Sequence, residues 1–322
     1  MRLIAWLLFV FTLLPQAWAD KQSELAHMLS KYPQADANQD GSLTEEEAGN
    51  YVLRNLQRKR PNRGSGIRNR SLIDAYEAHT YKKLPYRLLK PTTIKPGQQY
   101  PLVVSLHGSG GIGNDNVSNL RSWNAVMARP AWREKYPSFV LVPQRKPGGT
   151  WGPKPNSARA KDFYVRNDLL PLLELIAKIR QEQPIDDARI YALGSSGGGI
   201  GTWNILLAKP DLFAAAIPVC GRFPAKPEDY AKLTPVPIWC FHGSVDQLID
   251  VEQSRHAFSE LTKAGGLIKY TELRGVKHNS WIQAFSYQKD DASKGYITKR
   301  SNDRCDPTSN SWDWLFRQKK TR

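Results

Sequence analysis

One glycine-rich stretch contains the residue best suited to nucleophilic chemistry. The segment LGSSGG at 193–198 follows the apolar run RIYA and precedes GIGTWNILLAK, which has the pattern of a helix. The pattern G-x-S-x-G fits with Ser196 at its centre, because a register centred on Ser195 would need glycine where Leu193 stands. Glycines on both sides let the chain turn sharply from strand to helix and expose the serine hydroxyl. We therefore predict Ser196 as a nucleophile; the alternative is a glycine turn that only begins a helix.

A serine hydroxyl needs a base, and a base needs an acid to orient it. His278 directly follows the strand-like run LIKYTEL, which makes it the best placed histidine of the chain. Between Ser196 and His278, Asp246 follows the apolar run PIWCFHG, with Asp250 as the second choice. The order serine, aspartate, histidine is the order of one known arrangement of the catalytic triad. We predict that His278 takes the proton of Ser196 and that Asp246 holds His278.

Charge that develops on a substrate carbonyl oxygen needs hydrogen-bond donors, normally backbone N–H groups. The residue after the nucleophile, Gly197, is one expected donor, and Ser109 or Gly110 in the loop LHGSGG is the other. That loop also contains the dinucleotide-binding pattern G-x-G-x-x-G. A dinucleotide site would need an acidic residue after the next strand, where the sequence has Pro143-Gln144. The dinucleotide interpretation is therefore the weaker one.

A second cluster of chemistry-bearing residues lies near the N-terminus, in DANQDGSLTEEE. Counted from the first aspartate, it has oxygen ligands at the positions of an EF-hand loop, with Gly41 at the turn. The predicted ligands are Asp36, Asn38, Asp40, Ser42 (through its carbonyl), Thr44 and Glu47. The alternative is an acidic helix start. We expect one calcium ion with a structural role, and no cofactor for the chemistry at Ser196.

Composition divides the chain into four parts. Residues 1–19 have a short basic start, an apolar core and an Ala-x-Ala end, which is typical of a cleaved signal peptide. Residues 20–59 form the predicted EF-hand module, 60–74 a basic linker and 75–322 the catalytic domain. We expect a secreted or periplasmic protein with no membrane span after cleavage.

The elements that position these residues are short apolar runs that alternate with helical patterns from residue 100 onward. Such alternation predicts a mostly parallel sheet with helices on both faces, an α/β fold. In these sheets, ligands bind at the carboxyl ends of the strands, which is where the loop at 107–110, Ser196, Asp246 and His278 all fall.

The motifs LHGSGG, GSSGGG, FHGSVD and GVKHNSW together resemble the α/β-hydrolase superfamily. More narrowly, they resemble exported bacterial esterases of the polyhydroxybutyrate-depolymerase-like and feruloyl or acetyl-xylan esterase-like group, over about residues 75–322. The resemblance implies an α/β-hydrolase fold and a serine carboxylesterase. Residues 285–307 look like an added loop, and the EF-hand lies outside the family domain.

The same residues leave the substrate open. The short connection after FAAAIPVCG carries no apolar lid, which suits a polymeric substrate, and Trp151 and Trp281 are candidates to line the cleft. We predict acetyl or hydroxycinnamoyl esters of polysaccharide. The alternatives are a peptidase or polyester depolymerase on the same fold, or a calcium-dependent binding protein without activity.

The net charge and the cysteines bear on nucleic-acid binding and on disulfide formation. The net charge of +16 is scattered and no nucleic-acid motif accompanies it, so a solvated basic surface is favoured over a nucleic-acid site. Of the three cysteines, Cys240 lies in an apolar run and is expected to be a buried thiol, and Cys220 and Cys305 are candidates for a disulfide.

Overall fold

The computed structural model describes residues 23, 25–36, 38–44, 47, 70–152 and 166–320. The chain divides into two compact units, Met1–Arg63 and Gly64–Arg322. The predicted signal peptide, the second helix of the predicted EF-hand module and most of the predicted linker lie outside the described residues. Among the helices described, none is long and apolar enough to cross a membrane.

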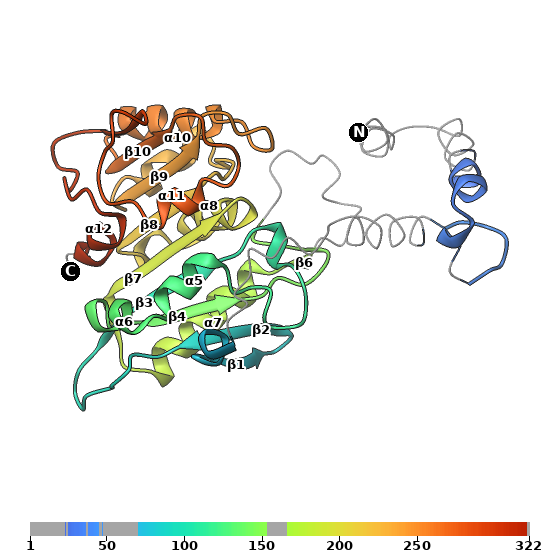
Figure 1. Ribbon diagram of the computed structural model, residues 1–322, viewed down its shortest axis with the longest axis horizontal. Helices are drawn as coiled ribbons and strands as arrows, with labels where there is room; N and C mark the ends of the chain where they lie inside the picture. The colour runs from blue at the N-terminus through green and yellow to red at the C-terminus, as the bar shows by residue number, and fades with distance from the viewer. Residues whose placement is uncertain are drawn as a thin grey trace. The chain divides into compact units, whose positions relative to one another are not determined.

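The larger unit is built on a nine-stranded sheet with the order β1-β2-β4-β3-β7-β8-β9-β10-β11 (Figure 1). From β4 to β10 neighbouring strands are parallel, whereas β1, β2 and β11 pair in antiparallel fashion at the two edges. The strands are β1 Tyr76–Tyr81, β2 Leu84–Leu89, β3 Tyr100–Leu106, β4 Phe139–Pro143, β7 Ile185–Ser195, β8 Ala215–Val219, β9 Ile238–Gly243, β10 Ile268–Leu273 and β11 Tyr296–Arg300. The predicted α/β-hydrolase fold, with its mostly parallel sheet, is confirmed.

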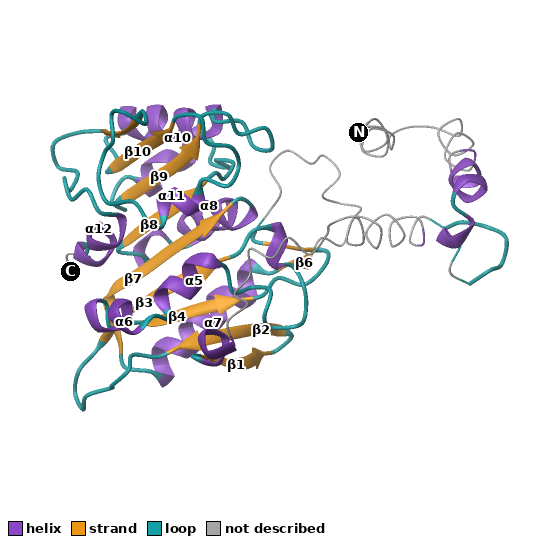
Figure 2. Cartoon of the chain, viewed as in Figure 1, coloured by secondary structure: helices purple, strands orange, loops and turns teal. Residues whose placement is uncertain are grey.

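Helices cover both faces of this sheet (Figure 2). Along β3, Leu102, Val104 and Leu106 pack into one apolar cluster and Val103 into the other, as expected for side chains that alternate between faces. One cluster includes residues of α7 Leu169–Glu182, α8 Gly197–Ala208, α9 Tyr230–Leu233 and α10 Glu252–Lys263. The other includes residues of α5 Ser122–Met127, α6 Pro130–Lys135, α11 Trp281–Ala284 and α12 Ser311–Arg317. Burial on both faces explains why the central strands are apolar throughout.

Three segments differ from the sequence-based expectations. Within the expected linker, Arg70–Asp74 form helix α4, and Ile73 packs against the core. Within the expected added loop, Tyr296–Arg300 form the edge strand β11, whose alternating and largely exposed residues pair with β10. A two-stranded parallel pair, β5 Gly149–Thr150 and β6 Arg166–Asn167, stands apart from the main sheet.

The smaller unit has a core of its own. Residues 25–31 are helical, the short 3-10 helix η1 spans Pro33–Ala35, and the acidic loop follows directly. Ala35 and Leu43 are buried there against Leu25, Met28, Leu29 and Tyr32. Leu43 therefore points into a small core, as the EF-hand pattern predicts.

Candidate active site

The turn between β7 and α8 holds Ser196 in an uncommon backbone conformation. Its φ is 56° and its ψ is −121°, a region that non-glycine residues rarely occupy. A Cβ on Gly194 would lie 2.5 Å from Gly198 O, and a Cβ on Gly198 would lie 2.0 Å from Leu106 O. Both positions of the G-x-S-x-G pattern therefore need glycine, because the turn packs directly on the backbone of β3.

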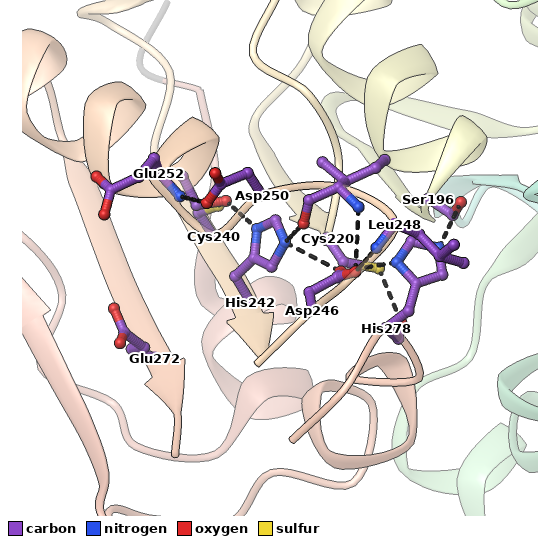
Figure 3. A network of polar contacts seen from close by, with 12 residues as sticks. Ser196, Cys220, Cys240, His242, Asp246, Leu248, Asp250, Glu252, Glu272 and His278 are labelled. Carbon is purple, nitrogen blue, oxygen red and sulfur yellow. Dashed lines mark hydrogen bonds and ion pairs between the residues drawn. The ribbon is translucent and has the colours of Figure 1, made fainter. Parts of the chain in front are cut away.

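A continuous set of hydrogen bonds joins the three residues predicted for catalysis (Figure 3). Ser196 Oγ lies 2.8 Å from His278 Nε2, and His278 Nδ1 lies 2.7 Å from Asp246 Oδ2. Ser196, Asp246 and His278 follow β7, β9 and β10, respectively. In the sheet β8 lies between β7 and β9, and β10 is next to β9, so the carboxyl ends of these parallel strands lie close together. Asp250, the second choice for the acid, instead accepts a hydrogen bond from the N–H of Glu252 at the start of α10.

The carboxylate of Asp246 is held from several directions. Its Oδ1 accepts hydrogen bonds from the N–H groups of Leu248 and Ile249, at 2.8 and 3.1 Å. Burial alone would raise the pKa of the Asp246 carboxyl, but the hydrogen bonds from His278 and from these two N–H groups outweigh it and keep the pKa below its usual value. Asp246 is thus an anion that can stabilise a charged imidazole.

A second histidine, His242, contacts Asp246, and no local sequence pattern predicts this contact. His242 Nε2 lies 3.2 Å from Asp246 Oδ2 and 3.0 Å from Ile249 O, while its Nδ1 lies 2.7 Å from Ser254 Oγ. Because Nε2 faces two acceptors, the ring proton belongs on Nε2 and Ser254 donates to Nδ1. Burial lowers the pKa of His242, which keeps the ring neutral. His242 thus helps to hold Asp246, although it is not among the site residues predicted from the sequence.

The loop after β3 lies against the turn between β7 and α8, which holds Ser196 and is called the catalytic turn below. A Cβ on Gly108 would be 3.6 Å from Ser196 Oγ, and a Cβ on Gly197 would be 3.9 Å from the backbone N of Ser109. The structure thus brings Gly197 and Ser109, two of the predicted oxyanion donors, to the same place. Gly110 points elsewhere: Arg121 lies 3.0 Å from the position of its Cβ and donates to its carbonyl oxygen.

His107 fixes this loop. Its Nε2 accepts a hydrogen bond from the backbone N of Arg145, so its Nδ1 carries the proton and donates to Gly108 O at 2.6 Å. Burial lowers the pKa of His107 to about 3, so the ring is neutral at ordinary pH. The His-Gly pair therefore shapes the turn.

The two tryptophans suggested for the cleft differ. Trp281 is partly exposed and its ring stands edge-on to His278, with 5.8 Å between the ring centroids. Trp151 is only 2% exposed and donates to His107 O from below the loop. The suggestion that Trp151 lines the cleft is wrong, because its ring belongs to the core.

The three cysteines are buried and free, so Cys220 and Cys305 do not form a disulfide. The Cys220 thiol lies 3.3 Å from His278 O, and burial raises its pKa to about 12. Cys220, Asp246 and His278 are close enough together to suggest a metal site. A protonated thiol is a poor ligand, however, and both His278 nitrogens are engaged within the triad.

The acidic loop of the smaller unit forms a turn that is held by hydrogen bonds to its own carboxylates. The N–H groups of Gln39 and Gly41 donate to the carboxylate of Asp36, and Gly41 has a φ of 82°. The Thr44 hydroxyl donates to the Glu47 carboxylate at 2.7 Å. The donor set is entirely oxygen, and the residues therefore fit a calcium ion.

Comparison with known proteins places this site in a family. Residues 92–291, which include the catalytic turn, Asp246 and His278, match the model of the phospholipase/carboxylesterase family. The chain belongs to that family. This membership makes it a hydrolase of the α/β-hydrolase superfamily.

Individual relatives agree with this assignment. A solved structure of a thermostable esterase is 32% identical, with a TM-score of 0.62, and the match covers 77% of this chain and 64% of that one. NocK of Nocardia uniformis subsp. tsuyamanensis is 31% identical over 46% of this chain and 40% of its own length. The bifunctional acetylxylan esterase/xylanase XynS20E of Neocallimastix patriciarum is 26% identical over 62% of this chain and 28% of its own. The chain thus spans less than half the length of these two curated relatives.

Proposed function

We propose that this protein is a serine carboxylesterase that cleaves acetyl or hydroxycinnamoyl esters of polysaccharide. The observation that carries the proposal is the hydrogen-bonded series Ser196–His278–Asp246 at the carboxyl edge of the sheet. Membership of the phospholipase/carboxylesterase family supports the reaction class. The acetylxylan esterase among its relatives supports the substrate class.

The proposed reaction proceeds in two halves. Ser196 Oγ attacks the ester carbonyl while His278 Nε2 takes its proton, and the charged imidazole is stabilised by Asp246. The N–H groups of Gly197 and Ser109 donate to the oxyanion of the tetrahedral intermediate. Collapse of the intermediate breaks the bond to the alcohol oxygen, which receives the proton from His278 and leaves an acyl-serine. Water then attacks the acyl carbon and gives a proton to His278; when this second tetrahedral intermediate collapses, His278 returns the proton to Ser196 Oγ and the acid is released.

Trp281 supports an aromatic or sugar subsite beside the reaction centre. It is partly exposed and adjoins His278, so a phenolic acyl group or a sugar ring can pack against it. The connection from β8 to β9 holds only the short elements η4 Pro227–Asp229 and α9. This leaves room for a chain-like substrate.

Steady-state hydrolysis of 4-nitrophenyl acetate, 4-nitrophenyl butyrate and methyl ferulate by the wild-type protein and Ser196→Ala tests the proposal. We expect turnover by wild type and a loss of at least about a thousandfold in kcat for the variant. Equal activity of the two proteins would contradict the assignment of Ser196. Cleavage of peptide 4-nitroanilides but not of esters would identify a peptidase instead.

For the smaller unit we propose a structural calcium ion bound by Asp36, Asn38, Asp40, Thr44 and Glu47, with the carbonyl of Ser42. Calcium supplies a positive centre that these oxygens surround. Calorimetric titration of calcium into the full chain and into Glu47→Gln checks the proposal: we expect binding to the first and at least tenfold weaker binding to the second. Esterase activity that persists in chelator would agree with a structural role, whereas no binding by wild type would contradict the site. Export remains a prediction from residues 1–19.

A further inference from the structure

The side chain of Arg145 lies beside the predicted oxyanion donors. Arg145 follows β4, and its side chain passes under Gly149, where a Cβ would be 3.0 Å from Arg145 Cγ. It ends at the catalytic turn: Arg145 Nη2 is 3.6 Å from the position of a Cβ on Gly197. Ser109 N is 3.9 Å from that same position. The guanidinium group and both predicted oxyanion donors therefore surround one small region next to Ser196.

The guanidinium group of Arg145 has no ion-pair partner among the described residues. Arg145 is only 9% exposed, yet its Nε has no hydrogen-bond partner in the described part of the chain. Only the backbone of Arg145 forms hydrogen bonds with described residues. Its N–H donates to His107 Nε2, and its carbonyl oxygen accepts from the N–H of Gly113. The buried carboxylate of Asp168 lies beside the Arg145 side chain, because a Cβ on Gly149 would be 2.1 Å from Asp168 Oδ2 and 3.0 Å from Arg145 Cγ; it attracts the guanidinium without an ion pair between the two described residues. A buried cation without a hydrogen-bonded counter-ion destabilises a folded protein.

The position of Arg145 is nevertheless fixed. Its backbone N is bonded to His107, which in turn donates to Gly108 of the loop that carries Ser109. The backbone of Arg145 is thus tied to the loop that carries Ser109, and burial of the side chain limits the positions that the guanidinium can take.

Other positive side chains accompany it. Arg121 donates to Gly110 O and Ser118 O on the far side of the same loop. Arg222, just after β8, and Lys277, just before His278, are exposed. The acidic residue of this loop, Asp115, is already occupied by Ser118, Val117 and Gln144. Arg121, Arg222 and Lys277 thus add positive charge on segments that precede or follow residues of the site in the chain, within a protein of net charge +16.

We propose that Arg145 binds a carboxylate of the substrate, so that the preferred substrates are esters that carry an acid group close to the scissile bond. A guanidinium presents paired N–H donors whose geometry matches a carboxylate. Acylated acidic sugars, such as uronic acid residues of a polysaccharide, have this chemistry. The proposal rests on the proposed esterase function and names the substrate class for the same site.

Matched esters test the proposal. One pair is 4-acetoxybenzoate and its methyl ester, with the charge on the alcohol side. The other is the mono-4-nitrophenyl ester of adipic acid and 4-nitrophenyl hexanoate, with the charge on the acyl side. The quantity measured is kcat/KM for wild type, Arg145→Met and Arg180→Met. Arg180 is the control, because it pairs with Asp187 near the start of β7, at the opposite edge of the sheet from Ser196.

We expect Arg145→Met to lower kcat/KM at least tenfold for one of the two charged esters, mainly through KM, and less than threefold for its neutral partner. Arg180→Met should leave kcat/KM unchanged for the charged ester and for its neutral partner. Equal losses on charged and neutral esters would overturn the proposal and make Arg145 a general oxyanion-stabilising residue, while the esterase function would stand. No loss on any ester would also overturn it.

A binding measurement separates this proposal from the esterase function. Calorimetric titration of 4-hydroxybenzoate and of adipate into wild type and Arg145→Met needs no turnover. We expect at least one of these acids to bind wild type at least tenfold more tightly than the variant. Equal binding of both acids to the two proteins would refute the carboxylate site even if ester hydrolysis by Ser196 is found.

Discussion

Replacement of Asp246 by asparagine is expected to reverse the hydrogen bond on which the catalytic histidine depends. The Oδ1 atom of Asp246 accepts from two backbone N–H groups, those of Leu248 and Ile249. An asparagine at this position must keep its carbonyl oxygen at the place of Oδ1. In the flipped orientation, its NH₂ group would face the two backbone N–H groups, donor against donor. Its NH₂ group then faces His278 Nδ1, which is 2.7 Å from Oδ2 in the native protein.

That arrangement selects the wrong form of the histidine. With a donor at Nδ1, the neutral ring must carry its proton on Nε2, which then cannot accept the proton of Ser196. The comparable change in a serine protease lowers kcat about ten-thousandfold, and we expect a loss of that order here. Because the folded structure keeps both backbone hydrogen bonds, we expect KM to change much less than kcat.

The assay is hydrolysis of 4-nitrophenyl acetate between pH 6 and 9, with circular dichroism to verify folding. Asp250→Asn is the matched control: it makes the same chemical change four residues away, at a side chain that contacts the start of α10. We expect Asp250→Asn to retain at least half of the wild-type kcat. If Asp246→Asn keeps more than a tenth of the activity, or if Asp250→Asn loses more than Asp246→Asn, the reasoning about the triad is refuted.

Three further predictions concern the surroundings of the site. His242→Phe removes a hydrogen bond to a carboxylate, so the free energy of unfolding should fall by about 1.5–3 kcal/mol, with a smaller loss of kcat than in Asp246→Asn; unchanged stability in urea titrations would contradict this. Gly198→Ala places a Cβ against Leu106 O and should destabilise the protein by at least about 3 kcal/mol, whereas Gly197→Ala, with nothing nearer than 3.6 Å, should not. For Lys269, burial lowers the pKa to about 8, so the unfolded chain binds more protons than the folded one between pH 8 and 10.5. The unfolding free energy of wild type should therefore rise relative to Lys269→Met over that range, and a flat difference would argue against a buried charged amine.

The residues of the catalytic turn were predictable because each leaves a local mark on the sequence. Ser196 lies between glycines whose Cβ atoms would meet backbone, and this steric need appears as G-x-S-x-G. Asp246 and His278 each follow an apolar strand, so the parallel sheet brings them to one edge. The apolar runs PIWCFHG and LIKYTEL, which precede Asp246 and His278 in the sequence, form strands β9 and β10.

What the sequence did not predict depends on contacts between distant segments. The role of His242 requires the position of Asp246 after the turn, which no pattern around His242 specifies. Trp151 was suggested for the cleft because aromatic faces pack against sugars and phenolics, but its buried ring packs edge-on against His107. Arg145 carries no motif at all: its importance comes from its distance to Gly197, which only the folded chain defines. Strand β11 was taken for a loop because an edge strand with one exposed face lacks the apolar run of the central strands.

The residues of the proposed triad are separated by 82 and 32 positions along the chain, and each follows a different strand. No local segment therefore contains a working part of the site, and the hydrogen bonds between them form only when β7, β8, β9 and β10 have assembled in order. Pairing between such distant segments is slow, because the chain must close large loops before the contacts form. The first appearance of ester hydrolysis during refolding would consequently report the completion of the whole sheet, which makes the enzyme its own probe of folding.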